Sequence, residues 1–197
     1  MKEFLLGLDI GTTTISWSVL EKSSFKQIEA SNKPNDSFVG TAVQNPERIL
    51  SICLEIVDEV KKRFERVDAI GVTGQMHGIV ILDKGGNSIS PLYTWQYPTD
   101  SELCRKIAKV SGKNAYSGYG LVTLYGLMSQ NRIPVESASF CSIMDYVAMK
   151  LCGNTRPVVH TSVASCFGLF DLESNSFDID SCKKLGIGCS LLPEVTE

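Results

Sequence analysis

Residues 8–14 read LDIGTTT, so an acid ends an apolar run and is followed at once by a glycine and three hydroxyl residues. Phosphate is bound by closely approaching backbone N–H groups, which Gly11 permits, and the hydroxyls of Thr12 and Thr13 can supplement them. Asp9 would repel phosphate directly, so we expect it to hold a Mg²⁺ ion, through water, that neutralises the phosphates. The alternative is a simple hairpin turn in which Asp9 caps its own backbone.

The segment differs from two common nucleotide-binding motifs. It has no GK[ST] sequence, and the apolar residues at 15, 17 and 19 alternate with serines in the pattern of a strand. The turn therefore leads into a strand and not a helix, which excludes a P-loop and a Rossmann fingerprint.

A second segment, residues 74–78, reads GQMHG and places an amide, a thioether and an imidazole between two glycines. Gln75 and His77 can hydrogen-bond hydroxyl groups, and Met76 can cover an apolar sugar face. A third signal is Trp95, because an indole stacks on the C–H face of a sugar, and Gln96 follows it. Taken one at a time, these residues are also typical of turns and cores.

The elements that must carry these residues follow from periodicity and turn residues. Expected in chain order are strands at 3–10, 15–19 and 27–30, a loop at 31–44, a helix capped at Asn45 and running to Phe64, strands at 67–73 and 79–82, helices near 101–110, 122–130 and 145–151, and a strand near 167–172. Strands on both sides of a crossover helix predict an α/β sheet.

Composition limits the partners. The chain has 19 Lys and Arg against 22 Asp and Glu, a net charge of −3, with no long block of either sign, so we expect neither nucleic acid nor a membrane surface as partner. No stretch is long enough to span a bilayer. Seven cysteines without a CxxC pair predict reduced, mostly buried thiols and a cytoplasmic protein. A small molecule is the expected partner.

The three segments, in this order, resemble the FGGY carbohydrate kinases, whose N-terminal domain opens with a D-x-G-T-[ST] phosphate loop and carries GQMHG in the xylulokinase and sedoheptulokinase branches. The similarity runs over essentially the whole chain. Further segments that look like sedoheptulokinases are 94–96, 117–120, 144–147, 151–153, 156–157 and 191–193.

The resemblance implies an α/β, ribonuclease-H-like fold of the actin, Hsp70 and sugar kinase superfamily, with a mixed sheet and an inserted helical portion. It also implies ATP and Mg²⁺ as cosubstrate and cofactor, and a ketose or polyol as acceptor. The residue roles it implies are Asp9 for Mg²⁺ and phosphate, Gly11, Thr12 and Thr13 along the γ-phosphate path, and Gln75, Met76, His77, Trp95 and Tyr119 in the sugar pocket.

The family has a second domain, with the adenine site and the aspartate that acts as general base. We expect residues 1–197 to form an incomplete N-terminal, sugar-binding domain that lacks this C-terminal ATP-binding domain and is inactive alone. Where sedoheptulokinases follow the tryptophan with Gln-Asp, this chain has Gln96-Tyr97, and Ser162 stands where the family places an acid. The sugar stays open, as does a homodimer. Two alternatives are a non-catalytic sugar-binding or regulatory module and an actin-like ATPase without a sugar site.

Overall fold

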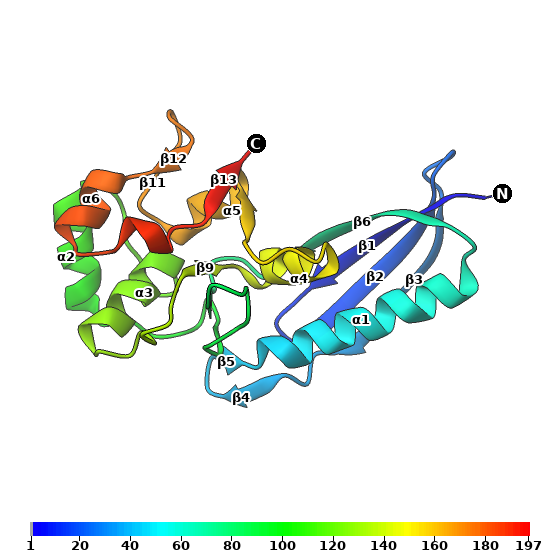
Figure 1. Ribbon diagram of the computed structural model, residues 1–197, viewed down its shortest axis with the longest axis horizontal. Coiled ribbons are helices and arrows are strands. Elements are labelled where there is room, and N and C mark those ends of the chain that lie inside the picture. Colours follow the sequence, from blue (N-terminus) through cyan, green and yellow to red (C-terminus); the bar gives the residue numbers. More distant parts are fainter. Residues whose placement is uncertain (1) are drawn as a thin grey trace.

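The computed structural model describes residues 2–197 (Figure 1). A four-stranded sheet with the strand order β3-β2-β1-β6 forms one end of the elongated molecule. Its strands are β1 (Phe4–Ile10), β2 (Thr14–Glu21), β3 (Gln27–Pro34) and β6 (Val67–Gly74). Strand β1 pairs antiparallel with β2 and parallel with β6, so the sheet is mixed and the expected α/β crossover is confirmed.

Helix α1 (Pro46–Arg63) makes the crossover from β3 to β6. The Asn45 side chain accepts hydrogen bonds from the N–H groups of Glu47 and Arg48, which satisfies two of the free donors at the helix start. The apolar stripe of the helix, including Ile49 and Ile56, is buried together with the alternate residues of β1. The predicted helix is thus confirmed within one residue.

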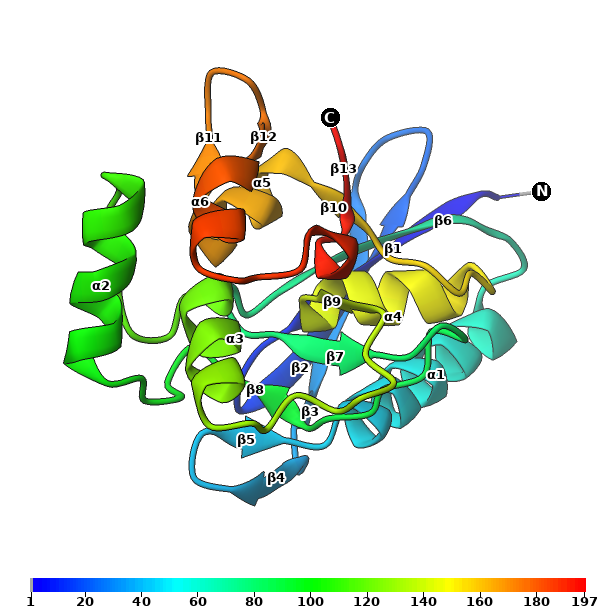
Figure 2. The same ribbon diagram turned by 60° about the vertical axis from the view of Figure 1, so that its left-hand side comes forward.

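The remaining elements form a second part of the molecule, in which Figure 1 shows α2, α3 and α6 grouped at the far end, and Figures 1 and 2 show α4 beside β6 and α1. Its strands are β4 (Phe38–Gly40), β5 (Val43–Gln44), β7 (Val80–Leu82), β8 (Leu92–Tyr93), β9 (Ser139–Cys141), β10 (Val158–His160), β11 (Phe170–Asp171), β12 (Ser176–Phe177) and β13 (Glu194–Thr196). Its helices are α2 (Ser101–Ser111), α3 (Gly120–Ser129), α4 (Ile143–Leu151), α5 (Thr161–Ala164) and α6 (Ile179–Lys184), with 3-10 turns η1 (Ser165–Phe167) and η2 (Cys189–Leu191). One continuous apolar core joins both ends.

Three local expectations need correction. Residues 31–44 are not a plain loop, because β3 continues to Pro34 and β4 and β5 follow. The strand expected near 167–172 shrinks to β11, since Ser165–Phe167 forms a 3-10 turn. All seven cysteines are free, as expected, but only Cys53, Cys141 and Cys182 are buried. Pairing with other strands, which the local pattern does not report, decided the first of these outcomes.

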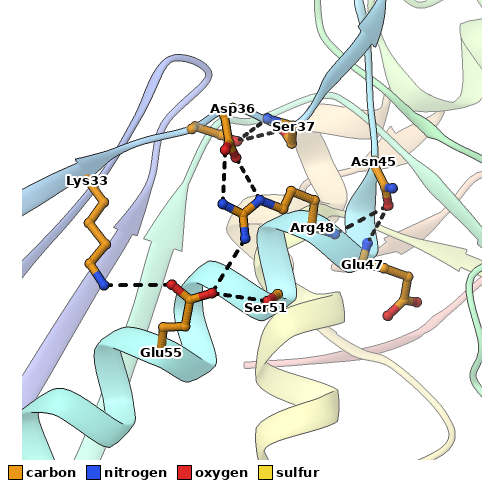
Figure 3. Close-up of polar contacts among 9 residues, drawn as sticks. Lys33, Asp36, Ser37, Asn45, Glu47, Arg48, Ser51 and Glu55 are labelled. Atoms are coloured by element: carbon orange, nitrogen blue, oxygen red, sulfur yellow. Dashed lines mark hydrogen bonds and ion pairs between the residues drawn. The ribbon is translucent and has the colours of Figure 1, made fainter.

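The segment before α1 is tied to the helix by polar contacts (Figure 3). Arg48 donates to both carboxylate oxygens of Asp36, at 2.8 and 2.9 Å, and also contacts Glu55. Lys33 pairs with Glu55 as well, at 3.8 Å. The Arg48 guanidinium lowers the pKa of Asp36 through these hydrogen bonds. The contacts hold residues 33–45 against the first turns of α1. The same segment contacts the 11–14 turn through Asn35.

The sheet face opposite α1 is open. A hollow of about 740 Å³ lies over it, lined by backbone and small side chains of β1, β2, β3 and β6, with Asp9 and Thr73 at one end. No helix within residues 2–197 is long and apolar enough to cross a membrane.

Candidate functional site

The turn between β1 and β2 is closed by a hydrogen bond from the Gly11 N–H to the Thr14 carbonyl, at 2.9 Å. A Cβ on Gly11 would lie 2.7 Å from that carbonyl oxygen, so the tight turn requires glycine. The N–H groups of Thr12 and Thr13 have no acceptor within residues 2–197. They are therefore available to an anion, and the phosphate loop expected from the sequence stays a prediction.

The turn is supported from below by Asn35, a buried residue that sequence analysis missed. Its side-chain amide donates to the Gly11 carbonyl at 2.9 Å, and its backbone N–H donates to the Thr13 carbonyl at 2.9 Å. These bonds satisfy the Gly11 and Thr13 carbonyls and hold the turn against Asn35. A Pro-Asn-Asp run suggests only a turn, so no local signal could have indicated this role.

The 11–14 turn and the GQMHG loop lie side by side because β1 and β6 are parallel neighbours that end together. In the register, Ile10 lies opposite Gly74, and the Gln75 N–H donates to the Ile10 carbonyl at 2.8 Å. A Cβ on Gly74 would lie 2.4 Å from the same carbonyl oxygen. Glycine at this position thus permits the close approach of the two loops.

His77 lies at the centre of a three-residue turn, with a φ of 70° and a hydrogen bond from the Gly78 N–H to the Met76 carbonyl. Such a backbone is strained for a residue other than glycine, and strain of this kind gathers at functional sites. Nδ1 of His77 lies 2.7 Å from the Cys166 carbonyl, which can only accept. In the neutral ring Nδ1 carries the proton, and Nε2 is left as an acceptor for a ligand hydroxyl.

Tyr119 stacks on His77 with ring centroids 5.0 Å apart and an interplanar angle of 5°. Tyr116 packs against Tyr119 edge-on. The structure therefore brings Tyr119, which sequence analysis linked to the pocket only through the resemblance, into contact with the GQMHG loop. Stacking and the Cys166 hydrogen bond together hold the imidazole in one orientation.

Trp95 reaches the 11–14 turn. Its indole N–H donates to the Thr12 hydroxyl at 3.2 Å, while 48% of its surface stays exposed. Gly118 permits the local packing, since a Cβ there would lie 2.0 Å from the Trp95 carbonyl. Met76 is 39% exposed. Exposed apolar side chains next to polar loops are what a sugar face would contact.

A buried residue, Gln44 at the end of β5, joins these loops and was also missed from the sequence. Its amide N–H₂ donates to the Thr12 carbonyl at 2.8 Å, and its amide oxygen accepts from Gln75 at 2.8 Å. The Thr12 hydroxyl in turn contacts the Gln75 amide oxygen at 3.3 Å. Three predicted residues, Thr12, Gln75 and Trp95, thus form one polar cluster with Gln44, which was not predicted.

Asp9 is exposed at the end of β1 and lies opposite Ser16 and Thr73 in the strand register. Among residues 2–197, no three His, Cys, Asp or Glu side chains are grouped to hold a metal ion. A single carboxylate surrounded by hydroxyls fits Mg²⁺, which keeps several waters and binds one or two carboxylates together with substrate phosphates. Asp9 does not fit a metal that requires an all-protein ligand set.

The residues that depart from the resemblance are engaged elsewhere. The Tyr97 hydroxyl, where an aspartate was expected, accepts a hydrogen bond from Arg132 at 2.7 Å, and its ring packs against Tyr93. Ser162 contacts Nδ1 of His160 at 2.8 Å. Neither position supplies a carboxylate.

Residues 4–197 match the model of the FGGY family of carbohydrate kinases, N-terminal domain. The chain is 28% identical to the sedoheptulokinase of Mus musculus, covering 98% of the chain and 47% of that protein. It is 26% identical to the xylulose kinase of Staphylococcus xylosus, covering 98% and 42%. The chain therefore spans about half the length of these relatives.

Solved structures agree in fold. The gluconate kinase of Lactobacillus acidophilus superposes with a TM-score of 0.87 at 18% identity, covering all of this chain and 42% of that one. The ligand-bound xylulose kinase of the same organism gives 0.86 at 18% identity, covering 99% and 42%. The α/β, actin-like fold expected from the resemblance is confirmed. The chain belongs to the FGGY family of carbohydrate kinases and carries the N-terminal domain of that family.

Proposed function

We propose that the protein containing this chain transfers the γ-phosphoryl group of ATP to a hydroxyl of a ketose or polyol, sedoheptulose-like or xylulose-like. One observation carries the proposal: a turn with two unpaired N–H groups among the described residues meets the candidate sugar-binding side chains of Gln75 and Trp95 at Thr12. In-line phosphoryl transfer requires acceptor and phosphate sites in direct contact, because catalysis is mostly positioning and charge stabilisation.

The acceptor would be recognised by the GQMHG loop. Nε2 of His77 would accept a hydrogen bond from a sugar hydroxyl, and Trp95 and Met76 would cover C–H faces of the ligand. Tyr97 and Ser162 supply no carboxylate, and the candidate sugar-binding residues Gln75, Met76 and Trp95 carry no charge. A ketose or polyol, which is uncharged, suits such a pocket better than a cationic substrate does.

The phosphate side would use Thr12 and Thr13 N–H groups, with Asp9 holding Mg²⁺ through water. The ion would offset the charge of the phosphates. A second domain, of the kind that the resemblance implies, would supply the adenine site and the base that deprotonates the acceptor hydroxyl. Closure of the two domains would exclude water from the phosphate. With its free cysteines, such an ATP-using protein would work in the cytoplasm.

The test is ATP turnover by the protein as its gene encodes it, with sedoheptulose, xylulose, ribulose or glycerol, in wild type and Asp9→Ala. Turnover with one sugar that is lost in Asp9→Ala supports the kinase and names the acceptor. Sugar binding without turnover would instead support a binding or regulatory module.

Calorimetric sugar binding to His77→Ala separates the third alternative, with His160→Ala as the comparison because His160 is the other histidine of the sequence, is exposed and is not a candidate sugar-binding residue. Loss of sugar affinity in His77→Ala alone supports the pocket. Equal behaviour of both variants, with ATP hydrolysis retained, supports an actin-like ATPase without a sugar site.

A further inference from the structure

The cluster around Gln44 contains a closed ring of hydrogen bonds through Thr12, Gln75 and Gln44, into which Trp95 donates, and the direction of each bond is determined. The Trp95 indole N–H can only donate, so the Thr12 hydroxyl accepts from it and its own hydrogen points to the Gln75 amide oxygen. The Gln75 amide N–H₂ then donates to the Gln44 amide oxygen, and the Gln44 N–H₂ donates to the Thr12 carbonyl. One direction of donation satisfies the whole ring.

Gln44 is the only member of this ring that belongs to neither the phosphate loop nor the candidate sugar-binding residues. Its side chain is fully buried, at 0% exposure, and Gln75 is buried as well. A buried amide makes strong, directional bonds in its low-dielectric surroundings, and an unpaired one is costly. Gln44 therefore restricts where Thr12 can lie relative to Gln75.

The backbone that delivers Gln44 is itself held in place. Residue 44 ends β5, which pairs with β8 through Leu92, and the next residue caps α1. The polar contacts of Figure 3 fix the same segment to the helix. Gln44 thus acts from a rigid element on two loops.

We propose that Gln44 is a positioning residue that couples the two halves of the site. Sugar bound at Gln75 and Trp95 would hold Thr12 in the position that binds phosphate, and phosphate bound at Thr12 would hold the GQMHG loop in the position that binds sugar. This inference rests on the proposed function. Coupling of this kind is reciprocal, so the nucleotide must change sugar affinity by the same factor as the sugar changes nucleotide affinity. Gln44 need not touch either ligand.

The test compares Gln44→Met, which keeps the size of the side chain but removes both amide bonds, with Gln27→Met, the same change at an exposed residue of β3. Sugar affinity is measured by calorimetry with and without a saturating non-hydrolysable ATP analogue, and kcat and KM are measured in the turnover assay. In Gln44→Met we expect sugar affinity alone to stay within about threefold, the coupling factor to fall close to one, and kcat to fall about 10- to 100-fold.

If Gln44 had only a structural role, Gln44→Met would lower the fraction of folded protein. The apparent kcat would then fall in proportion, and the coupling factor would not change. The inference is overturned if Gln44→Met keeps the coupling factor and kcat of the wild type, or if the wild-type protein itself has a coupling factor of one. Either result leaves the kinase proposal intact. Absence of sugar binding and turnover in the wild type overturns both.

Trp95→Phe tests the same ring if Gln44→Met does not fold. Phenylalanine keeps an aromatic face for the sugar but lacks the indole N–H that donates to Thr12. We expect the coupling factor to fall several-fold, whatever the affinity of this variant for sugar alone. An unchanged coupling factor in Trp95→Phe would overturn the inference by itself.

Discussion

Gly74→Ala should separate the two loops of the site. The added Cβ would lie 2.4 Å from the Ile10 carbonyl oxygen and 2.8 Å from the Ile10 Cβ, whereas ordinary contact begins at 3.4 Å. The ends of β1 and β6 must therefore part by about 1 Å, and the neighbour that must move is backbone, which has little freedom. Overpacking of this kind costs about 1–3 kcal/mol of stability.

The functional cost should exceed the loss of stability, because a shift of about 1 Å between reacting groups can lower kcat about 100-fold. The assay pairs urea unfolding with sugar-dependent ATP turnover. Gly71→Ala is the matched control, since it lies on the same strand and a Cβ there meets nothing within 4 Å. Alanine at 71 should leave both quantities unchanged or raise stability slightly. Equal behaviour of the two variants would refute the close-approach argument.

Three further predictions concern stability, pH and the aromatic stack. Burial raises the pKa of Asp145 from 3.8 to about 6, although hydrogen bonds from Ser142 oppose the shift. The protonated group therefore stabilises the fold fully below about pH 4, and the free energy of unfolding falls by about 3 kcal/mol as pH rises through 6. Asp145→Asn should flatten this fall when urea unfolding is measured from pH 4.5 to 7.5, and parallel stability curves for the variant and the wild type would contradict the prediction. Asn45→Ala should cost about 1 kcal/mol in urea unfolding by removing the α1 cap, with no change in sugar affinity. Tyr119→Leu should weaken sugar binding about three- to tenfold by calorimetry, since stacked pairs contribute about 0.5–1.5 kcal/mol, and Tyr119→Phe should not.

Elements with strong local patterns were predictable. The β1–β2 hairpin shows alternation around a glycine turn, and α1 shows an N-cap, a first-turn proline and an apolar stripe. The family resemblance rested on the LDIGTTT and GQMHG segments, which are contiguous in the chain. Such features depend on residues a few positions apart, so sequence alone carries them.

The parts of the site that were missed depend on residues far apart. Gln44 lies 32 residues from Thr12 and 31 from Gln75, and Asn35 lies 24 from Gly11. Their polar side chains sit in segments that local composition assigns to a loop, and only the pairing of β5 with β8 and the course of residues 33–45 beneath the turn bury them.

The chemistry of His77 divides in the same way. Its presence between two glycines is a sequence fact, and with it the expectation of a hydroxyl-binding imidazole. Which ring nitrogen is left as a free acceptor was decided by the Cys166 carbonyl, 89 residues away, and the orientation of the ring by Tyr119. Residue types and local turns determine what groups a site can offer, whereas their tautomer, direction and mutual distance come from tertiary packing, because those properties depend on partners that only the folded chain brings together.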